Sequence, residues 1–302
     1  MTAERIEVGL SDGRVLEAVS EGDPDGVLLV FHHGSPGAAV PFETFDRAAA
    51  GRGIHLVTYS RPGFGGSSRR EGRRVVDCVP DVAALTDALG AERFVTVGSS
   101  GGGPHALACA ARLPERVMAA ATIAGVAPYD APDLDWTAGM GEDNQIEYPL
   151  AATDRLAHLE WLRPQAEAMT TVRPKDIVAA MRTIISEVDE ASLSGELGEV
   201  MAESFHAAFR HGLWGWRDDD LAFVASWGFS LDEIRVPVRI WQGRHDLMVP
   251  FAHGEWLLEN VPTASSGLRP EHGHLSLAIG GIGEIFDDLL TIAKGARSGG
   301  AV

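Results

Sequence analysis

A stretch rich in glycine, residues 98–102, holds two adjacent serines and reads Gly-Ser-Ser-Gly-Gly. The apolar run of residues 93–97 precedes it, and a helical pattern with Pro104 in its first turn follows. A flexible loop would account for the glycines but not for this helical pattern. The local prediction is therefore a strand, a sharp turn and a helix, with serine at the tip of the turn.

The spacing of the small residues indicates which serine stands at the tip. A nucleophile on a strand-to-helix turn is strained, and the residues two before and two after it must be small so that strand and helix can pass closely. Centring the turn on Ser100 places Gly98 and Gly102 there, whereas centring it on Ser99 places the branched Val97 there. We predict Ser100 as the nucleophile and Ser99 as its neighbour.

A serine hydroxyl needs a base to take its proton and an acid to orient that base. Asp246 follows the apolar run of residues 238–241, where an acid at a strand end is expected, although aspartate is also common in turns. Further on, His272 and His274 precede the last helix. The order Gly-His-Leu favours His274, because glycine allows a tight turn and Leu275 anchors the loop, and His272 is the alternative.

The tetrahedral oxyanion of acyl transfer needs two N–H donors, each worth about 3 kcal/mol of barrier. The residue after the nucleophile, Gly101, supplies one. The loop after the apolar run of residues 27–31 reads His-His-Gly-Ser-Pro-Gly, and Pro36 has no N–H, so Ser35 is predicted as the second donor.

Composition excludes several function classes. The 302 residues are 45% hydrophobic and carry a formal net charge of -18, which argues against a nucleic-acid partner. The two cysteines show no metal-ligand spacing, so no metal site is predicted. Without a membrane-spanning stretch or a signal sequence, the expected location is the cytoplasm, with no membrane partner, and no oligomeric state is predicted.

Apolar runs alternate with helical patterns, which predicts an α/β fold with a mostly parallel sheet flanked by helices. Residues 5–8 and 15–19 indicate a hairpin, but the region from about 127 to 231 contains only helical patterns. We predict a core of residues 1–126 and 232–302 interrupted by a helical cap insertion at 127–231. Most tryptophans and methionines of the insertion are expected in its core, and a few could line a pocket.

Together the motifs around Ser35, Ser100, Asp246 and His274 resemble the α/β-hydrolase superfamily over about residues 5–294. The glycine-rich stretch 60–68, Ser-Arg-Pro-Gly-Phe-Gly-Gly-Ser-Ser, is a fifth match, similar to the turn after the family's fourth strand. The resemblance implies hydrolysis of an ester, amide or related bond without metal or organic cofactor. Some members supply the acid after an earlier strand, which makes Asp130 a rival to Asp246.

Serine at the turn departs from the haloalkane dehalogenases and epoxide hydrolases, which use aspartate there. The segment around Ser35 resembles the His-Gly-Gly-Pro-Gly of proline iminopeptidases but differs at that serine. The leading interpretation is a serine esterase acting on a small, mainly apolar, ester-like substrate through an acyl-enzyme. A carbon–carbon bond hydrolase or cofactor-free perhydrolase with the same triad is an alternative, and a ligand receptor or signalling protein on this fold is another.

Overall fold

The computed structural model describes residues 3–193 and 195–298, so the ends of the predicted core, residues 1–2 and 299–302, lie outside the described residues. Eight strands form one sheet, with the order β1-β2-β4-β3-β5-β6-β7-β8. Their bounds are β1 Glu4–Gly9, β2 Val15–Gly22, β3 Val27–His32, β4 Ile54–Tyr59, β5 Phe94–Ser99, β6 Val117–Ile123, β7 Val238–Trp241 and β8 Ala264–Ser266.

Pairing within the sheet separates a short antiparallel edge from a parallel centre. β1 and β2 form the predicted hairpin and β2 pairs antiparallel with β4, while every pair from β4 to β8 is parallel. All seven residues of β6 are buried, as expected for a central parallel strand covered on both faces. The predicted α/β class with a mostly parallel sheet is confirmed.

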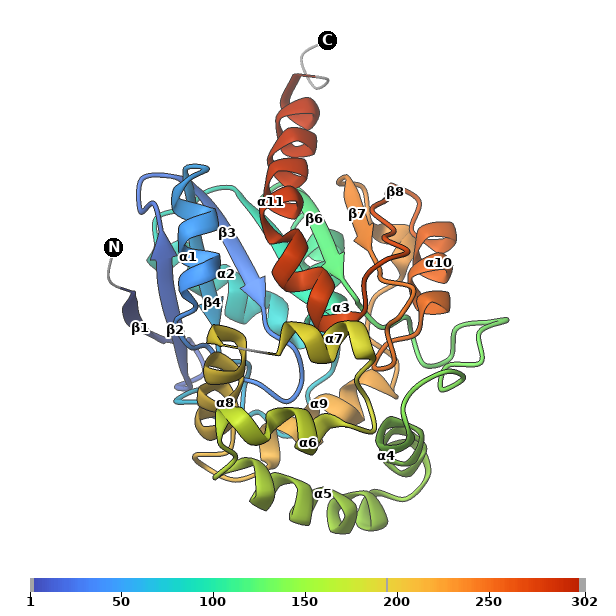
Figure 1. Ribbon diagram of the computed structural model, residues 1–302. Helices are drawn as coiled ribbons and strands as arrows, with labels where there is room; N and C mark the ends of the chain where they lie inside the picture. Colours follow the sequence, from blue (N-terminus) through green and yellow to red (C-terminus); the bar gives the residue numbers. More distant parts are fainter. Residues whose placement is uncertain (1–2, 194, 299–302) are drawn as a thin grey trace.

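Helices cover both faces of this sheet (Figure 1). α1 (Glu43–Ala50) and α11 (His274–Ser298) pack on one face, where residues such as Phe45 and Phe286 join the inner residues of β3 and β6. α2 (Val79–Ala88), α3 (Gly103–Arg112) and α10 (Phe251–Asn260) pack on the other face. The 3-10 turns are η1 Val75–Cys78, η2 Ser100–Gly102, η3 Pro174–Asp176 and η4 Leu231–Glu233.

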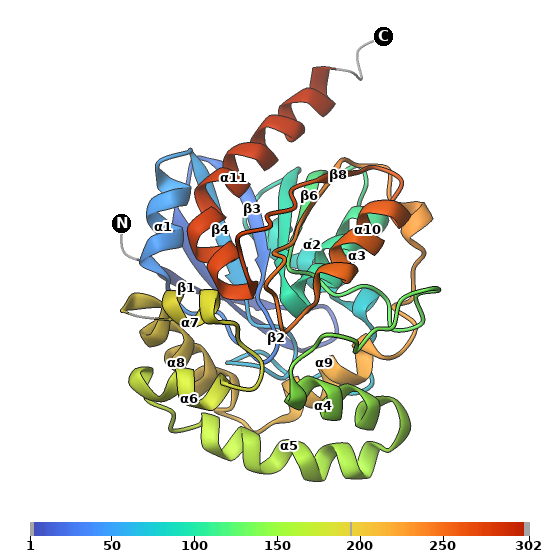
Figure 2. The same cartoon turned by 45° about the vertical axis from the view of Figure 1, so that its right-hand side comes forward.

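Between β6 and β7 the described chain contains helices and no strand. These helices are α4 Glu142–Thr153, α5 Arg155–Met169, α6 Ile177–Met181, α7 Glu187–Ser192, α8 Glu196–Ala208 and α9 Trp214–Phe223. They gather beyond the carboxyl ends of the parallel strands, as Figures 1 and 2 show from two directions. Ligands of open α/β sheets bind at that end of the strands, so the helices stand where they can cover a site.

Residues 174–188 of the predicted helical region are divided into η3, α6 and the start of α7. The branched Thr183, Ile184 and Ile185 follow α6, and branched residues lose rotamer freedom in a helix. Ser186 then begins α7, because its hydroxyl accepts a hydrogen bond from the Asp189 N–H. Among the described helices, none combines the length and the apolar content that crossing a membrane requires.

Candidate active site

Ser100 occupies the sharp turn between β5 and α3. Its φ of 53° lies in the left-handed region, whereas Ser99 before it is extended with a φ of -98°. A Cβ on Gly98 would lie 2.1 Å from the Gly102 carbonyl oxygen, and a Cβ on Gly102 would lie 2.0 Å from the His32 carbonyl oxygen. Only glycine fits at both places, which agrees with the turn centred on Ser100.

Asp246 lies in the loop between β7 and α10, with only 3% of its surface exposed. Its Oδ1 accepts hydrogen bonds from the N–H groups of Met248 and Val249, both at 2.8 Å. Its Oδ2 accepts one from the Gln242 amide at 2.9 Å and one from His274 Nδ1 at 2.8 Å. Each oxygen accepts two hydrogen bonds, and this environment suits a carboxylate with a fixed orientation.

His274 is the first residue of α11 and is buried beside Asp246. Because Nδ1–H donates to Asp246, the neutral ring presents Nε2 as its free acceptor. Burial opposes the charged form of His274, but the charge and hydrogen bond of Asp246, with the charge of Asp189, outweigh burial and raise its pKa above 6.5. The Asp246–His274 pair thus has the orientation that a general base requires.

The alternative residues lie elsewhere. Asp130 is exposed and lines a separate cavity with Trp227 and Trp256. His272 is half-buried, and its Nε2 lies 3.9 Å from a carboxylate oxygen of Glu271. Of the candidate acids and bases, the structure therefore brings together Asp246 and His274.

The loop after β3 lies directly against the turn at Ser100. A Cβ on Gly34 would lie 3.5 Å from the Cβ of Ser100, and a Cβ on Gly101 would lie 3.1 Å from the Cβ of Ser35. Ser35 and Gly101, the two predicted oxyanion donors, are therefore neighbours beside Ser100.

A buried arginine that the sequence analysis did not assign holds this loop. Arg61, in the glycine-rich stretch after β4, donates to the carbonyl oxygens of His33 and Gly34. It is fully buried and pairs with Asp219 of α9 at 2.6 Å. Burial opposes ionisation of Asp219, but Arg61 and Arg73 outweigh it and hold its pKa well below the usual range. The loop that carries Ser35 is thus tied to the last helix of the insertion.

His33 completes this support. Its Nε2 accepts the Arg61 N–H at 3.1 Å, which leaves the proton on Nδ1, and Nδ1–H donates to the Gly34 oxygen at 2.6 Å. Burial lowers its pKa well below 6.5, so the ring is neutral and keeps this arrangement.

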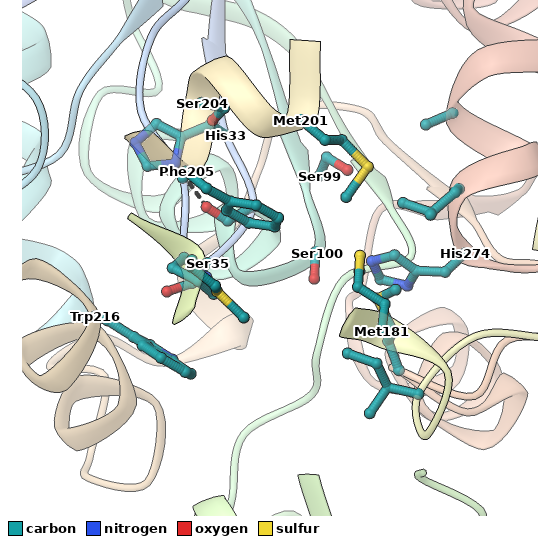
Figure 3. A pocket seen from close by; sticks show the side chains of 18 of the residues that line it. His33, Ser35, Ser99, Ser100, Met181, Met201, Ser204, Phe205, Trp216 and His274 are labelled. Carbon is teal, nitrogen blue, oxygen red and sulfur yellow. Dashed lines mark hydrogen bonds between the residues drawn. The ribbon is translucent and has the colours of Figure 1, made fainter. Parts of the chain in front are cut away.

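A cavity of about 280 Å³ opens over Ser100 (Figure 3). Ser100 and His274 both line it, although no hydrogen bond joins these two side chains in the described structure. Such contacts often tighten only when substrate binds. The insertion contributes five of its tryptophans and methionines to the wall, more than the sequence analysis expected: Trp161, Met169, Met181, Met201 and Trp216.

Acidic residues contribute to the wall of the cavity. Asp143 and Glu147 of α4 line it, and among its described lining residues there is no lysine or arginine. Burial, with Asp220 nearby, raises the pKa of Glu147 well above its usual range, and the Trp216 indole N–H donates to Glu147 at 2.7 Å. Among the residues that the structure describes, no cluster of three potential metal ligands occurs. The cavity therefore suits an uncharged ligand better than an anion.

Comparison with known proteins assigns this arrangement to a family. The model of the alpha/beta hydrolase fold family matches residues 27–277, a span from β3 to the first residues of α11. The chain belongs to the alpha/beta hydrolase fold family. The resemblance drawn from the motifs is thereby confirmed.

Individual relatives of this α/β-hydrolase are distant. An uncharacterized hydrolase of Bacillus subtilis, YcgS, is 26% identical over 90% of this chain and 92% of its own length. The pimeloyl-[acyl-carrier protein] methyl ester esterase of Aromatoleum aromaticum is 28% identical over 74% of this chain and 81% of its own. A solved esterase of Thermogutta terrifontis superposes with a TM-score of 0.68 at 18% identity, covering 96% of this chain and 99% of that one, a likeness of fold.

Proposed function

We propose that this α/β-hydrolase is a serine esterase, which cleaves an ester or related acyl bond of a small, mainly apolar substrate through an acyl-enzyme on Ser100. The observation that carries the proposal is the buried hydrogen bond between Asp246 and His274. The His274 ring lines the same cavity as Ser100, whose backbone is strained. Serine at this position supports acyl transfer, because a serine ester is an intermediate that water can hydrolyse.

Each residue has one task in the proposed reaction. His274 Nε2 takes the Ser100 proton as the hydroxyl oxygen attacks the substrate carbonyl, and Asp246 stabilises the imidazolium. The Ser35 and Gly101 N–H groups stabilise the oxyanion. His274 then protonates the leaving alcohol, the carbon–oxygen bond breaks, and an acyl group remains on Ser100. Water, deprotonated by His274, releases the acid and restores the serine.

The cavity supports the substrate class. Its volume of about 280 Å³ lies near the lower end of small-molecule sites, which span roughly 300–1,000 Å³. Phe205, Met181 and Met201 of the insertion lie around Ser100 in the cavity wall (Figure 3). A distant relative in Comamonas testosteroni, 25% identical, is named as a hydrolase of dienedioate and trienedioate compounds, which carry two carboxylates. Because the described wall contains no lysine or arginine, we favour uncharged esters over that substrate class.

We expect kcat/KM for p-nitrophenyl esters to rise from acetyl to butyryl and hexanoyl and to fall at decanoyl. Each added methylene gains about 0.8 kcal/mol when it is buried, until the cavity is full. The measurement is steady-state hydrolysis of the four esters, with succinyl monoester as the anionic comparison. A flat dependence of kcat/KM on chain length, or faster turnover of the succinyl ester, would contradict an apolar cavity over Ser100. Product release that stops after one equivalent per protein would instead favour the alternative that the protein is a ligand receptor.

We expect His274→Ala to lower kcat by about 10⁴-fold or more, because the base is lost. His272→Ala is the matched control and should leave kcat close to that of the unaltered protein. In the unaltered protein, kcat/KM should rise with pH through a pKa above 6.5, since His274 acts as a base only when neutral and its pKa is raised. Equal losses in the two variants, or an acid limb well below 6.5, would argue against His274 as the base.

A further inference from the structure

The helix that carries His274 lacks a capping side chain of its own. The first N–H groups of a helix need partners outside the helix, and a side chain at the residue before it usually provides one. In α11 that residue is Gly273. The Gly273 N–H donates to the Ser276 hydroxyl at 2.8 Å, which is one half of a capping box.

Asp189 of α7 supplies the other half from 85 residues away. Its Oδ1 accepts hydrogen bonds from the N–H groups of Leu275 at 2.8 Å and Ser276 at 2.9 Å. Its Oδ2 accepts one from the His274 N–H at 2.9 Å and one from the Ser186 hydroxyl at 3.1 Å. The Asp189 side chain is fully buried. All four contacts are donors to the carboxylate, so none of its acceptor capacity is left for another partner.

Gly273 is matched to this carboxylate. A Cβ at residue 273 would lie 2.4 Å from the Asp189 Oδ2 and 2.6 Å from its Oδ1. A residue able to cap α11 in the usual way would therefore collide with Asp189. A side chain at position 273 and the carboxylate of Asp189 would occupy the same space. Glycine at position 273 leaves that space to the carboxylate.

We propose that Asp189, contributed by the helical insertion, is a positioning residue that fixes the start of α11 and with it the place of His274. The inference rests on the proposed function, in which His274 is the base. Asp189 does not belong to the cavity wall, so it acts on the reaction through the first residues of α11, which include His274. The insertion then has two tasks: it covers Ser100, and it fixes the base.

Two effects follow from the geometry. Without Asp189, three buried N–H groups would lose their partner, and the backbone that sets the His274 ring would be free to shift. The positive end of the α11 dipole would also act uncompensated on His274 and disfavour its charged form. The other titratable groups around this ring are Asp246, which bonds to Nδ1, and four that share the cavity wall with it: His33, Asp143, Glu147 and Tyr148.

We expect Asp189→Asn to lower kcat about 10- to 100-fold with little change in KM, since small displacements of a reacting group cost rate rather than affinity. The acid limb of kcat/KM should move to lower pH, because loss of the negative charge lowers the pKa of His274 and keeps it neutral in more acid solution. The matched control is Asp154→Asn. Asp154 caps α5 of the same insertion through the N–H groups of Leu156 and Ala157 and should leave both quantities unchanged.

A double variant separates positioning from folding. Asp189→Ala opens the space beside residue 273, so Gly273→Asp in that background can cap α11 from the usual position and return the charge. We expect the double variant to recover at least tenfold in kcat over Asp189→Ala and to move the acid limb back up. Gly273→Asp alone should be impaired, because two carboxylates would compete for one space. Thermal unfolding of each variant shows which losses are losses of fold.

The inference would be overturned by an Asp189→Asn variant with unchanged kcat and an unchanged acid limb, or by a double variant that folds but recovers neither. If Asp189→Asn does not fold, the double variant still decides between the two outcomes. Labelling of the unaltered protein with a fluorophosphonate tests the proposed function separately. If the reagent labels the unaltered protein but Asp189→Asn has no effect on the kinetics, only the positioning role is rejected. If the reagent does not label the unaltered protein, the serine mechanism itself is rejected.

Discussion

Ser100→Ala is expected to reduce ester hydrolysis by about 10⁶-fold, the size of the loss when the serine nucleophile of a catalytic triad is removed. The loss follows from the reaction itself, because no acyl-enzyme can form without the Ser100 oxygen. Alanine tolerates the turn no worse than serine does, so the thermal unfolding temperature should change little. The measurement is kcat for a p-nitrophenyl ester, together with the melting curve of each variant.

Ser99→Ala is the matched control, because Ser99 also lines the cavity but lies in extended backbone at the end of β5. We expect it to keep most of the activity. Collapse of kcat in Ser99→Ala together with near-normal rates in Ser100→Ala would reverse the roles that we propose for these two serines.

Asp246→Asn is expected to lower kcat by about 10⁴-fold without unfolding the protein. The Oδ1 position accepts two backbone N–H groups, so the asparagine oxygen would take that place and its amide NH₂ would face His274. The asparagine NH₂ and the His274 Nδ1–H are both donors and cannot form a hydrogen bond with each other. His274 would therefore have to carry its proton on Nε2, and a protonated Nε2 cannot accept the serine proton. Steady-state kinetics across pH checks this expectation.

Asp130→Asn should have no comparable effect, because Asp130 is exposed and lies outside the cavity that holds Ser100. Near-normal rates in Asp246→Asn with a collapse in Asp130→Asn would show that the acid comes from the loop after β6.

The features that the sequence predicts well depend on close neighbours in the chain. Gly98 and Gly102 identify the turn because the steric demand there is local, and the backbone of Ser100 has the positive φ that this turn requires. The parallel strands could be predicted because they are short apolar runs that are buried on both faces, as in β6.

What the sequence does not reveal depends on partners far along the chain. Asp189 lies 85 residues before His274, and Asp219 lies 158 residues after Arg61. Neither aspartate stands in a motif, so only the fold shows its contacts. α9 shows the same limit, because its three consecutive aspartates, residues 218–220, are all buried and interrupt the apolar period that indicates a helix.

The choice between His272 and His274 also involves both neighbours in the chain and a residue far along it. Local order favoured His274, through the glycine before it and the leucine after it. The structure supplies a further reason for that glycine, because its missing side chain leaves room for Asp189. A local sequence pattern can therefore favour one residue while the physical reason for that pattern lies in another element.

In the proposed reaction Ser100 forms the covalent intermediate, and the residue to which a fluorophosphonate attaches tests this assignment. The protein would be treated with the reagent, digested, and analysed by mass spectrometry of the peptide that contains residues 98–102. We predict one adduct per chain, carried by Ser100, absent from Ser100→Ala and retained in Ser99→Ala. An adduct on Ser99, or an unaltered protein that takes up no reagent while it still hydrolyses esters, would contradict it.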